Sequence, residues 1–453
     1  MPTSREVLRQ LYDAAVAGAV TGPVTSRAVS ALSIPRDRRV WIFAVGKASH
    51  AMATAAVASL NRSLNQIVGG LIVAHEDAPS PYGTIAVARG DHPIPGPQSF
   101  AAAQRIGELA ARMKSGDVAL ALVSGGASSL IAAPLRGMSD HDIPRLYELL
   151  LASGLDITAM NTVRKRFMRW GGGRLALAIA PAATHCLAVS DVIGDEISTI
   201  GSGPCVPDPT TADDVIEILE NANLLSRLTK PFRTYLDDVS RGAEPETPKV
   251  GHPAFAHGSA RVIANNRGAL DSAADRARAL GASAVYVVDK PLTGEAAQRG
   301  EDIARWLLEL RATASSTRAP RYAIWGGETT VTLHARAPEG ARKAPTPAPS
   351  PPGGRCQELA LAAARVLGEA GDRAAGISLL AAGTDGRDGP TDAAGACVDA
   401  TTWALVQSAG VDPERALAQH ESYAALAAAN ALFKPGPTGT NVMDVVIGLV
   451  DGD

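Results

Sequence analysis

The chain repeats one pattern: a short, continuous apolar run, then a turn rich in glycine, serine or aspartate, and then a helical pattern. The runs cover residues 40–45, 119–123, 186–189, 322–325 and 377–382. An uninterrupted apolar run, unlike an alternating one, indicates a strand that is buried on both faces. Strands that alternate with helices predict an α/β fold with a largely parallel sheet.

The polar turns that follow these runs are the expected location of the functional residues. They begin at Gly46, Ser124, Ser190, Gly326 and Gly383. In parallel α/β sheets, ligands bind beyond the carboxyl ends of the strands, and each of these turns lies at such an end.

Composition excludes several classes of protein. The chain has 453 residues, which suggests two or three domains, and its net charge of −3 argues against a dedicated nucleic-acid binder. Aromatic residues make up only 4%, so the core must consist of Ala, Leu, Val and Ile. The uncharged stretch 118–135 contains a Gly/Ser turn and a proline, which favours a buried strand and turn over a membrane span.

Cysteine usage and the amino terminus point to a cytoplasmic setting. The four cysteines, at positions 186, 205, 356 and 397, form no C-x-x-C pair and are too few for a disulfide scaffold. The first residues contain no apolar segment of the kind found in a secretory signal. We therefore expect a reduced, cytoplasmic protein.

Two stretches interrupt the α/β pattern. Residues 240–259 are rich in Gly and Pro, so we expect a domain boundary near residue 245, which separates domains 1–245 and 246–453. Residues 336–354 form a low-complexity Pro/Ala segment, which predicts an extended, exposed loop because it cannot build a core.

Gly46-Lys47 follows one predicted strand and opens a predicted helix. A cation at a helix amino terminus opposes the helix dipole, so its placement there makes sense if an anion binds between them. The alternative is a lysine that only reaches solvent. The site is not a Walker A loop, because Trp41 stands where that motif requires glycine.

The turn from Ser124 to Ser129 (SGGASS) offers backbone N–H groups and hydroxyls after another strand. Such a turn can hold a phosphate or a carboxylate, or it can simply feed a helix, and the residues alone do not decide between the two.

Residues 161–174 (NTVRKRFMRWGGGR) carry five cations among aromatic side chains. They fit either a solvated helix face or a contact with a substrate carboxylate or phosphate. The piece 171–176 matches G-x-G-x-x-A, but a basic segment precedes it where a dinucleotide site requires a strand.

Two further turns are acidic, with Asp191 after one predicted strand and Asp385 after another. Mg²⁺ needs only one or two protein carboxylates when substrate phosphates complete its shell. Aspartates also commonly cap helices and turns, so both interpretations stay open. Together with Lys47 and Arg355, these turns supply the cations, amides and carboxylates that phosphoryl transfer requires.

Nine segments, in order and across nearly the whole chain, give the sequence a specific resemblance to a known family. They are VGKASHAMA (45–53), GDHPIPGP (90–97), VSGGASSL (123–130), NTVRKRFMRWGGGRLA (161–176), SDVIGDEISTIGSGPCVPDPTT (190–211), GGETTVTL (326–333), GGRCQELALA (353–362), GTDGRDGPTDAAGA (383–396) and GTNVMD (439–444). The sequence resembles the glycerate 2-kinases whose carboxyl-terminal part is called MOFRL. This chain departs from the family pattern at Cys356 and Cys205, where Asn and Thr are usual.

The resemblance implies two three-layer α/β domains with largely parallel sheets, a Rossmann-like amino-terminal domain and an active site in the cleft between the two. It implies phosphorylation of the 2-hydroxyl of D-glycerate with ATP and Mg²⁺, and catalytic roles for Lys47 and Arg355. The binding residues that it implies are Gly46, Ser124, Gly125, Gly126, Ser128, Asn161, Arg164, Glu328 and Thr384. Asp191 and Asp385 are the expected metal ligands.

The partner is then a small molecule, with no nucleic acid and no membrane, and the protein is a monomer or a homodimer. Two other functions stay open from the residues. One is an NAD(P)H-dependent hydroxypyruvate reductase, and the other is a non-catalytic nucleotide-binding module.

Overall fold

The structure is a computed structural model, and it describes residues 2–155, 157–313, 319–332 and 353–452. The expected Pro/Ala loop at 336–354 lies outside the described residues except for Gly353 and Gly354. No helix among the described residues is long and apolar enough to cross a membrane.

The chain divides into two compact units, which we call the amino-terminal unit (residues 21–264) and the carboxyl-terminal unit (residues 1–20 and 265–453). The boundary therefore differs from the one expected near residue 245. After the Gly/Pro-rich stretch the chain adds one more strand, β6 (Ser259–Ala264), to the first sheet. The first helix, α1 (Ser4–Ala19), packs in the carboxyl-terminal unit against α11 (Asn266–Ala279).

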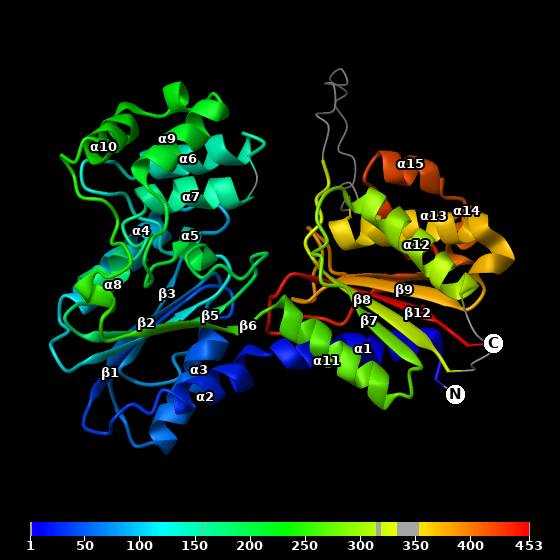
Figure 1. Cartoon of the computed structure of the whole chain (residues 1–453), viewed down its shortest axis with the longest axis horizontal. Coiled ribbons are helices and arrows are strands. Elements are labelled where there is room, and N and C mark those ends of the chain that lie inside the picture. The colour runs from blue at the N-terminus through cyan, green and yellow to red at the C-terminus, as the bar shows by residue number, and fades with distance from the viewer. Residues whose placement is uncertain (1, 156, 314–318, 333–352, 453) are drawn as a thin grey trace. The chain divides into compact units, whose positions relative to one another are not determined.

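The amino-terminal unit contains a fully parallel sheet of six strands in the order β3-β2-β1-β4-β5-β6 (Figure 1). Besides β6, the strands are β1 (Arg39–Val45), β2 (Gln66–Ala74), β3 (Ile85–Arg89), β4 (Val118–Val123) and β5 (Ala183–Val189). Buried strands at β1, β4 and β5 confirm three of the apolar runs, and the uncharged stretch after residue 118 is strand and turn. The order reverses between β1 and β4, as in doubly wound Rossmann-like sheets.

Helices cover both faces of this sheet (Figure 1). One face carries α2 (Thr21–Ser30) and α3 (Ser49–Arg62), and the other carries α4 (Pro97–Ala110), α5 (Ala127–Leu130) and α8 (Arg174–Ile179). A separate apolar cluster joins α6 (Asp142–Leu151), α7 (Ile157–Phe167), α9 (Ala212–Asn221) and α10 (Lys230–Ser240). Short 3-10 turns lie at Ile200–Ser202, Leu225–Arg227 and Pro253–Phe255.

The carboxyl-terminal unit contains a mixed sheet in the order β11-β10-β9-β12-β8-β7 (Figure 1). Its strands are β7 (Ala284–Val287), β8 (Arg321–Gly327), β9 (Ile377–Gly383), β10 (Gly395–Asp399), β11 (Leu432–Phe433) and β12 (Asp444–Val450). The α/β class is confirmed, but the expectation that this second sheet is also largely parallel is wrong: among its described strands, β7 and β8 pair in parallel and the other neighbours pair antiparallel. An apolar run indicates that a strand is buried but not in which direction it runs. The link from β9 to β10 contains no helix, which a parallel connection usually needs to return the chain to the end of the sheet where β9 begins.

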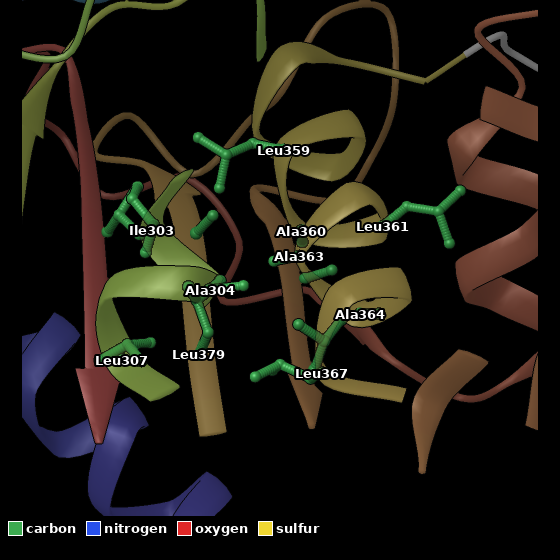
Figure 2. Close-up of a cluster of buried hydrophobic side chains, with 14 of the residues drawn as sticks. Ile303, Ala304, Leu307, Leu359, Ala360, Leu361, Ala363, Ala364, Leu367 and Leu379 are labelled. Atoms are coloured by element: carbon green, nitrogen blue, oxygen red, sulfur yellow. The ribbon is translucent and has the colours of Figure 1, made fainter. Parts of the chain in front are cut away.

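The helices of this unit also lie on both faces of the sheet. Those not yet given are α12 (Ala296–Ala312), α13 (Arg355–Ala370), a 3-10 turn at Gly371–Ala374, α14 (Thr402–Ser408), α15 (Pro413–Ala418) and α16 (Ser422–Ala428). Figure 2 shows Ala and Leu side chains of α12, α13 and β9 packed together in one cluster, among them Ala304, Leu307, Ala363 and Leu379. Small side chains let these helices approach closely, as the low aromatic content predicts.

Candidate functional site

Two glycine-containing turns meet in the amino-terminal unit at the point where its strand order reverses. The Lys47 N–H donates to the Gly125 carbonyl (2.9 Å), and the Ala48 N–H donates to the Ser124 hydroxyl (3.1 Å). Gly46 has a φ of +125°, and a Cβ there would lie 2.2 Å from the Ser124 hydroxyl, so only glycine fits. Because ligands of doubly wound sheets bind at this reversal, the two turns form the best-placed site in the unit.

Asp191, at the end of the neighbouring strand β5, completes this cluster. A Cβ on Gly125 would lie only 1.9 Å from Asp191 Oδ2, so the carboxylate rests directly on the glycine. Burial raises the pKa of Asp191, although the positive charge of Lys47 opposes the rise. The Lys47 side chain is exposed, so its ammonium is available to an anion. We call Gly46, Lys47, Ser124, Gly125, Gly126 and Asp191 the switch-point cluster.

His92 borders the same cluster, and sequence reasoning missed it. A Cβ on Gly126 would lie 3.1 Å from His92 Nε2 and 3.6 Å from Lys47 Cγ. Burial, with the nearby Lys47 charge, lowers the pKa of His92 to about 4, so the imidazole is neutral at pH 7. The signal was its place in the segment GDHPIPGP, which precedes α4.

The other expected binding residues of this unit lie in other surroundings. The Ser128 hydroxyl is 2.7 Å from the hydroxyl of Ser202. Asn161 and Arg164 lie half-buried on α7, and the Arg164 guanidinium lies over the Tyr147 ring at 4.6 Å from its centroid. Their roles in binding stay predictions.

Three cations of the basic stretch 161–174 are structural. Lys165 Nζ lies 2.7 Å from an Asp208 oxygen, and Arg166 Nη1 lies 2.5 Å from a Glu246 oxygen. Burial by itself would raise the pKa of both carboxyls, but these partners hold it at about 2. Arg174 donates to backbone carbonyls of the same stretch. For these three, both expectations, a solvated face and a substrate contact, are wrong.

Arg355, the first residue of α13, is the centre of a cluster in the carboxyl-terminal unit. Its Nε and Nη2 donate to the two Asp444 oxygens (2.6 and 3.0 Å), and its Nη1 lies 2.6 Å from a Glu328 oxygen. Strand β12 runs antiparallel to β8 and β9, so its first residue, Asp444, pairs with their last residues, Gly327 and Gly383. Burial acts to lower the pKa of Arg355, yet the Asp444 and Glu328 carboxylates outweigh it and raise the pKa.

A second carboxylate, Asp388, caps the start of α13. Its oxygens accept from the N–H groups of Cys356 (3.2 Å) and Gln357 (2.8 Å). Burial raises the pKa of Asp388 to about 7, against the effect of these hydrogen bonds. Cys356 and Cys205, the two expected departures from the family pattern, are both buried. We call Glu328, Arg355, Asp388 and Asp444 the Arg355 cluster.

The two expected residues of the turn after β9 differ in accessibility. Asp385 is half-buried and accepts from the Arg387 N–H. Thr384 is fully buried, and its hydroxyl accepts from the Val442 N–H (2.9 Å) and donates to the Met443 carbonyl (2.6 Å). Its binding role stays a prediction, and its visible contacts are with the backbone.

Asp191 and Asp385 belong to different units. Their expected role as ligands of a metal ion therefore stays a prediction. Within the part of the chain that the structure describes, no group of three or more His, Cys, Asp or Glu residues is placed to hold a metal ion. A site that uses fewer protein carboxylates and completes its shell with substrate phosphates remains compatible with that finding.

Sequence reasoning missed Asp444 and Asp388 as site residues. Asp444 is the first residue of an apolar run. It lies beside Arg355 because β12 runs antiparallel to its neighbours, and the composition of a strand does not indicate its direction. Asp388 was visible within an acidic turn, but its helix partner lies about thirty residues earlier in the chain.

The fold and the two clusters define a class of protein, a two-unit α/β enzyme with a cation at each candidate site. The family model of a domain of unknown function, DUF4147, matches residues 7–237, and the MOFRL family model matches residues 321–444. The chain belongs to the family of the glycerate 2-kinases with a MOFRL domain.

Relatives and solved structures agree over most of the chain. It is 35% identical over 412 residues to the D-glycerate 2-kinase of Thermotoga maritima, with 91% of each chain covered. It is 34% identical to a glycerate 2-kinase of Pyrococcus horikoshii, with 91% of this chain and 87% of that one covered. A crystal structure of the Thermotoga maritima glycerate kinase matches with a TM-score of 0.80 at 32% identity, covering 98% of this chain and 99% of that one.

Another relative, from Agrobacterium vitis, bears the provisional name of a hydroxypyruvate reductase. It is 37% identical over 443 residues, which cover 98% of this chain and 94% of the relative.

Proposed function

We propose that this protein is a glycerate 2-kinase, which transfers the γ-phosphoryl group of ATP to the 2-hydroxyl of D-glycerate, with Mg²⁺. The observation that carries the proposal is the switch-point cluster, in which an exposed lysine follows one strand and a glycine turn follows the adjacent strand. That arrangement suits a charged phosphate, and the kinase names of the relatives suit it too.

Phosphoryl transfer asks a protein mainly for positioning and for charge that matches the transition state. Lys47 supplies an ammonium that stabilises negative charge on the transferring group or orients the substrate hydroxyl. Arg355 supplies a planar guanidinium, which recognises a phosphate or carboxylate through paired hydrogen bonds. Neutral His92 adds no positive charge beside Lys47 and leaves an imidazole to hydrogen-bond a substrate hydroxyl.

Asp191 and Asp385 fit a magnesium role, because each is a half-buried carboxylate in a turn beyond a strand end. When bound with the nucleotide, the ion neutralises charge on the phosphates. Asp191 and Asp385 would each offer oxygen ligands to the ion.

The reductase alternative has the Agrobacterium vitis relative in its favour. A dinucleotide fingerprint needs a glycine turn between a strand and a helix. The segment 171–176 instead follows the helix α7, and its glycine N–H groups at 172 and 173 donate to the carbonyls of Ser202 and Gly203. Those donors are therefore already used within the protein.

One assay separates the two functions. The protein is incubated with ATP, Mg²⁺ and D-glycerate while ADP release is followed, and a second sample receives NADH or NADPH with hydroxypyruvate. We expect ADP release that depends on D-glycerate, and no oxidation of the reduced cofactor. Cofactor oxidation without ADP release would replace the kinase by the reductase. The cytoplasmic location and the oligomeric state stay predictions.

A further inference from the structure

We propose that Asp444 is the positioning residue of Arg355: it holds the guanidinium in the orientation that phosphoryl transfer needs, and a clamped turn holds Asp444. The inference rests on the proposed function, because it assigns a task to Arg355 in that reaction. It concerns a residue that touches Arg355 and acts through it.

The two carboxylates on Arg355 differ in burial and in geometry. Asp444 engages both Nε and Nη2, and its side chain is 6% exposed. Glu328 engages Nη1 alone, and its side chain is 42% exposed. A two-point contact fixes the plane of the guanidinium, whereas a one-point contact does not. The buried Asp444 therefore sets the orientation of the guanidinium.

The turn that presents Asp444 is held in an uncommon conformation. Met443 has a φ of +69°, in the left-handed region that residues other than Gly, Asn and Asp seldom adopt. Such a residue persists only where the surrounding contacts over-determine it, and such residues concentrate at functional sites. The conformation of Met443 directs the next residue, Asp444, into β12 beside Arg355.

Two buried side chains supply those contacts. Asn266, the first residue of α11, donates its amide to the carbonyls of Val442 (2.7 Å) and Asp444 (3.0 Å). Thr384 accepts from the Val442 N–H and donates to the Met443 carbonyl. The backbone on each side of the left-handed residue is thus fixed, and the carboxylate is fixed with it.

A double-mutant cycle tests the proposal in the full-length protein. The variants are Asp444→Asn, Arg355→Ala and the two combined, with kcat, KM for both substrates and Tm measured for each. We expect Asp444→Asn to lower kcat by roughly 10- to 100-fold, because a misplaced group costs that much. In the Arg355→Ala background the same change should lower kcat less than about twofold, because a positioning residue has nothing left to position.

The remaining outcomes each decide the question. If the two losses multiply, Asp444 acts independently of Arg355, for example as a metal ligand, and the proposal is overturned. Wild-type kcat in Asp444→Asn, with a loss in Arg355→Ala, overturns this inference alone. Wild-type kcat in Arg355→Ala also removes Arg355 from the proposed function.

Two further variants guard against a structural explanation. Should Asp444→Asn fail to fold, Asp444→Glu keeps the charge and displaces the carboxylate, and its loss of kcat should again vanish in the Arg355→Ala background. The matched control is Glu301→Gln. Glu301, on α12, pairs with Arg305 and with Arg365 of α13, the helix that begins with Arg355. It should lose an ion pair with no change in kcat. A similar loss of kcat in this control would attribute the Asp444 effect to the helix in general.

Discussion

At the scale of single residues, the cations of the amino-terminal unit divide by what surrounds them. Lys165 and Arg166 are buried and both pair with the buried Asp208, and Arg166 also pairs with the more exposed Glu246. Lys47, in contrast, is exposed at the switch point. A buried ion pair uses its charge within the fold, whereas an exposed cation can respond to a ligand. The surroundings of Lys47 therefore support its proposed catalytic role, as the family resemblance does.

Lys47→Ala should lower kcat by roughly 100-fold or more, because it removes charge that stabilises the transition state. Tm should change little, since the side chain is exposed. Lys114→Ala is the matched control: this exposed lysine precedes β4, at the amino-terminal ends of the parallel strands and therefore away from Lys47, and should leave kcat unchanged. Steady-state kinetics of both variants check the prediction, and equal kcat values would remove Lys47 from the catalytic residues.

Asp388 should make the carboxyl-terminal unit less stable as the pH rises. Its pKa is about 7 in the folded protein, against 3.8 for an ordinary solvated aspartate, so between these values the unfolded chain binds fewer protons. The free energy of unfolding should then fall across this window, by at most about 4 kcal/mol. Urea unfolding at pH 5 and pH 8 measures the fall.

Asp388→Asn should reduce that pH dependence, because it removes the titrating group and keeps an acceptor for the α13 cap. An unchanged pH dependence in Asp388→Asn would show that this carboxyl titrates near its ordinary value.

The sequence predicted that the turns at Gly46 and Ser124 lie close together, and their hydrogen bonds confirm this proximity. Gly46, Lys47 and Ser124 stand directly beyond strands that the apolar runs mark, so their neighbourhood follows from the parallel topology. Asp444 and Asn266 could not be found in this way. Their roles depend on a strand direction and on a left-handed residue, and neither is encoded in a short local pattern.

At the scale of elements, α7 shows how a basic stretch can be structural. Lys165→Met leaves Asp208 as a buried carboxylate without its closest cation, and this should lower the free energy of unfolding by about 3 kcal/mol. Arg169→Met is the control, because this exposed residue of the same stretch lies over the Trp170 ring and should change stability by no more than about 1 kcal/mol. Chemical denaturation of both variants measures the difference, and equal stabilities would mean that Lys165 is not a structural cation.

Strands were easier to predict than their directions. The runs at 40–45 and 377–382 became β1 and β9, because continuous burial leaves a clear apolar signature. The reversal of β10 and β12 left no such signature, since antiparallel strands inside a covered sheet are equally apolar. The helical cluster of α6, α7, α9 and α10 was not predicted either, because these helices pack on one another and do not belong to the repeated pattern of strand, turn and helix.

At the scale of the whole molecule, the chain begins in one unit, builds the other and then returns. Helix α1 belongs to the carboxyl-terminal unit: Leu8, Leu11 and Tyr12 are buried, and the Tyr12 hydroxyl donates to the Gly383 carbonyl (2.8 Å). The Gly/Pro-rich stretch at 240–259 suggested a boundary between domains. It is a loop within the amino-terminal unit, because the chain adds β6 to the first sheet after it.

Residues 21–264 should therefore fold by themselves, whereas residues 265–453 should need α1. Without that helix, the apolar surface of α11 and the faces of β9 and β12 that α1 covers would be exposed to water. Circular dichroism and thermal unfolding of the three fragments, 21–264, 265–453 and 265–453 supplied with a 1–20 peptide, measure this dependence. A cooperative transition in 265–453 alone, equal to that with the peptide, would contradict it.

The central claim is the transfer of a phosphoryl group to the 2-hydroxyl of D-glycerate, and the position of that group in the product tests it most directly. The purified protein is incubated with ATP, Mg²⁺ and D-glycerate, and the product is identified by ³¹P nuclear magnetic resonance against authentic 2-phosphoglycerate and 3-phosphoglycerate. The account predicts 2-phosphoglycerate formed in step with ADP, and its loss in Lys47→Ala. A product that is only 3-phosphoglycerate, or no phosphorylated glycerate at all, would contradict it.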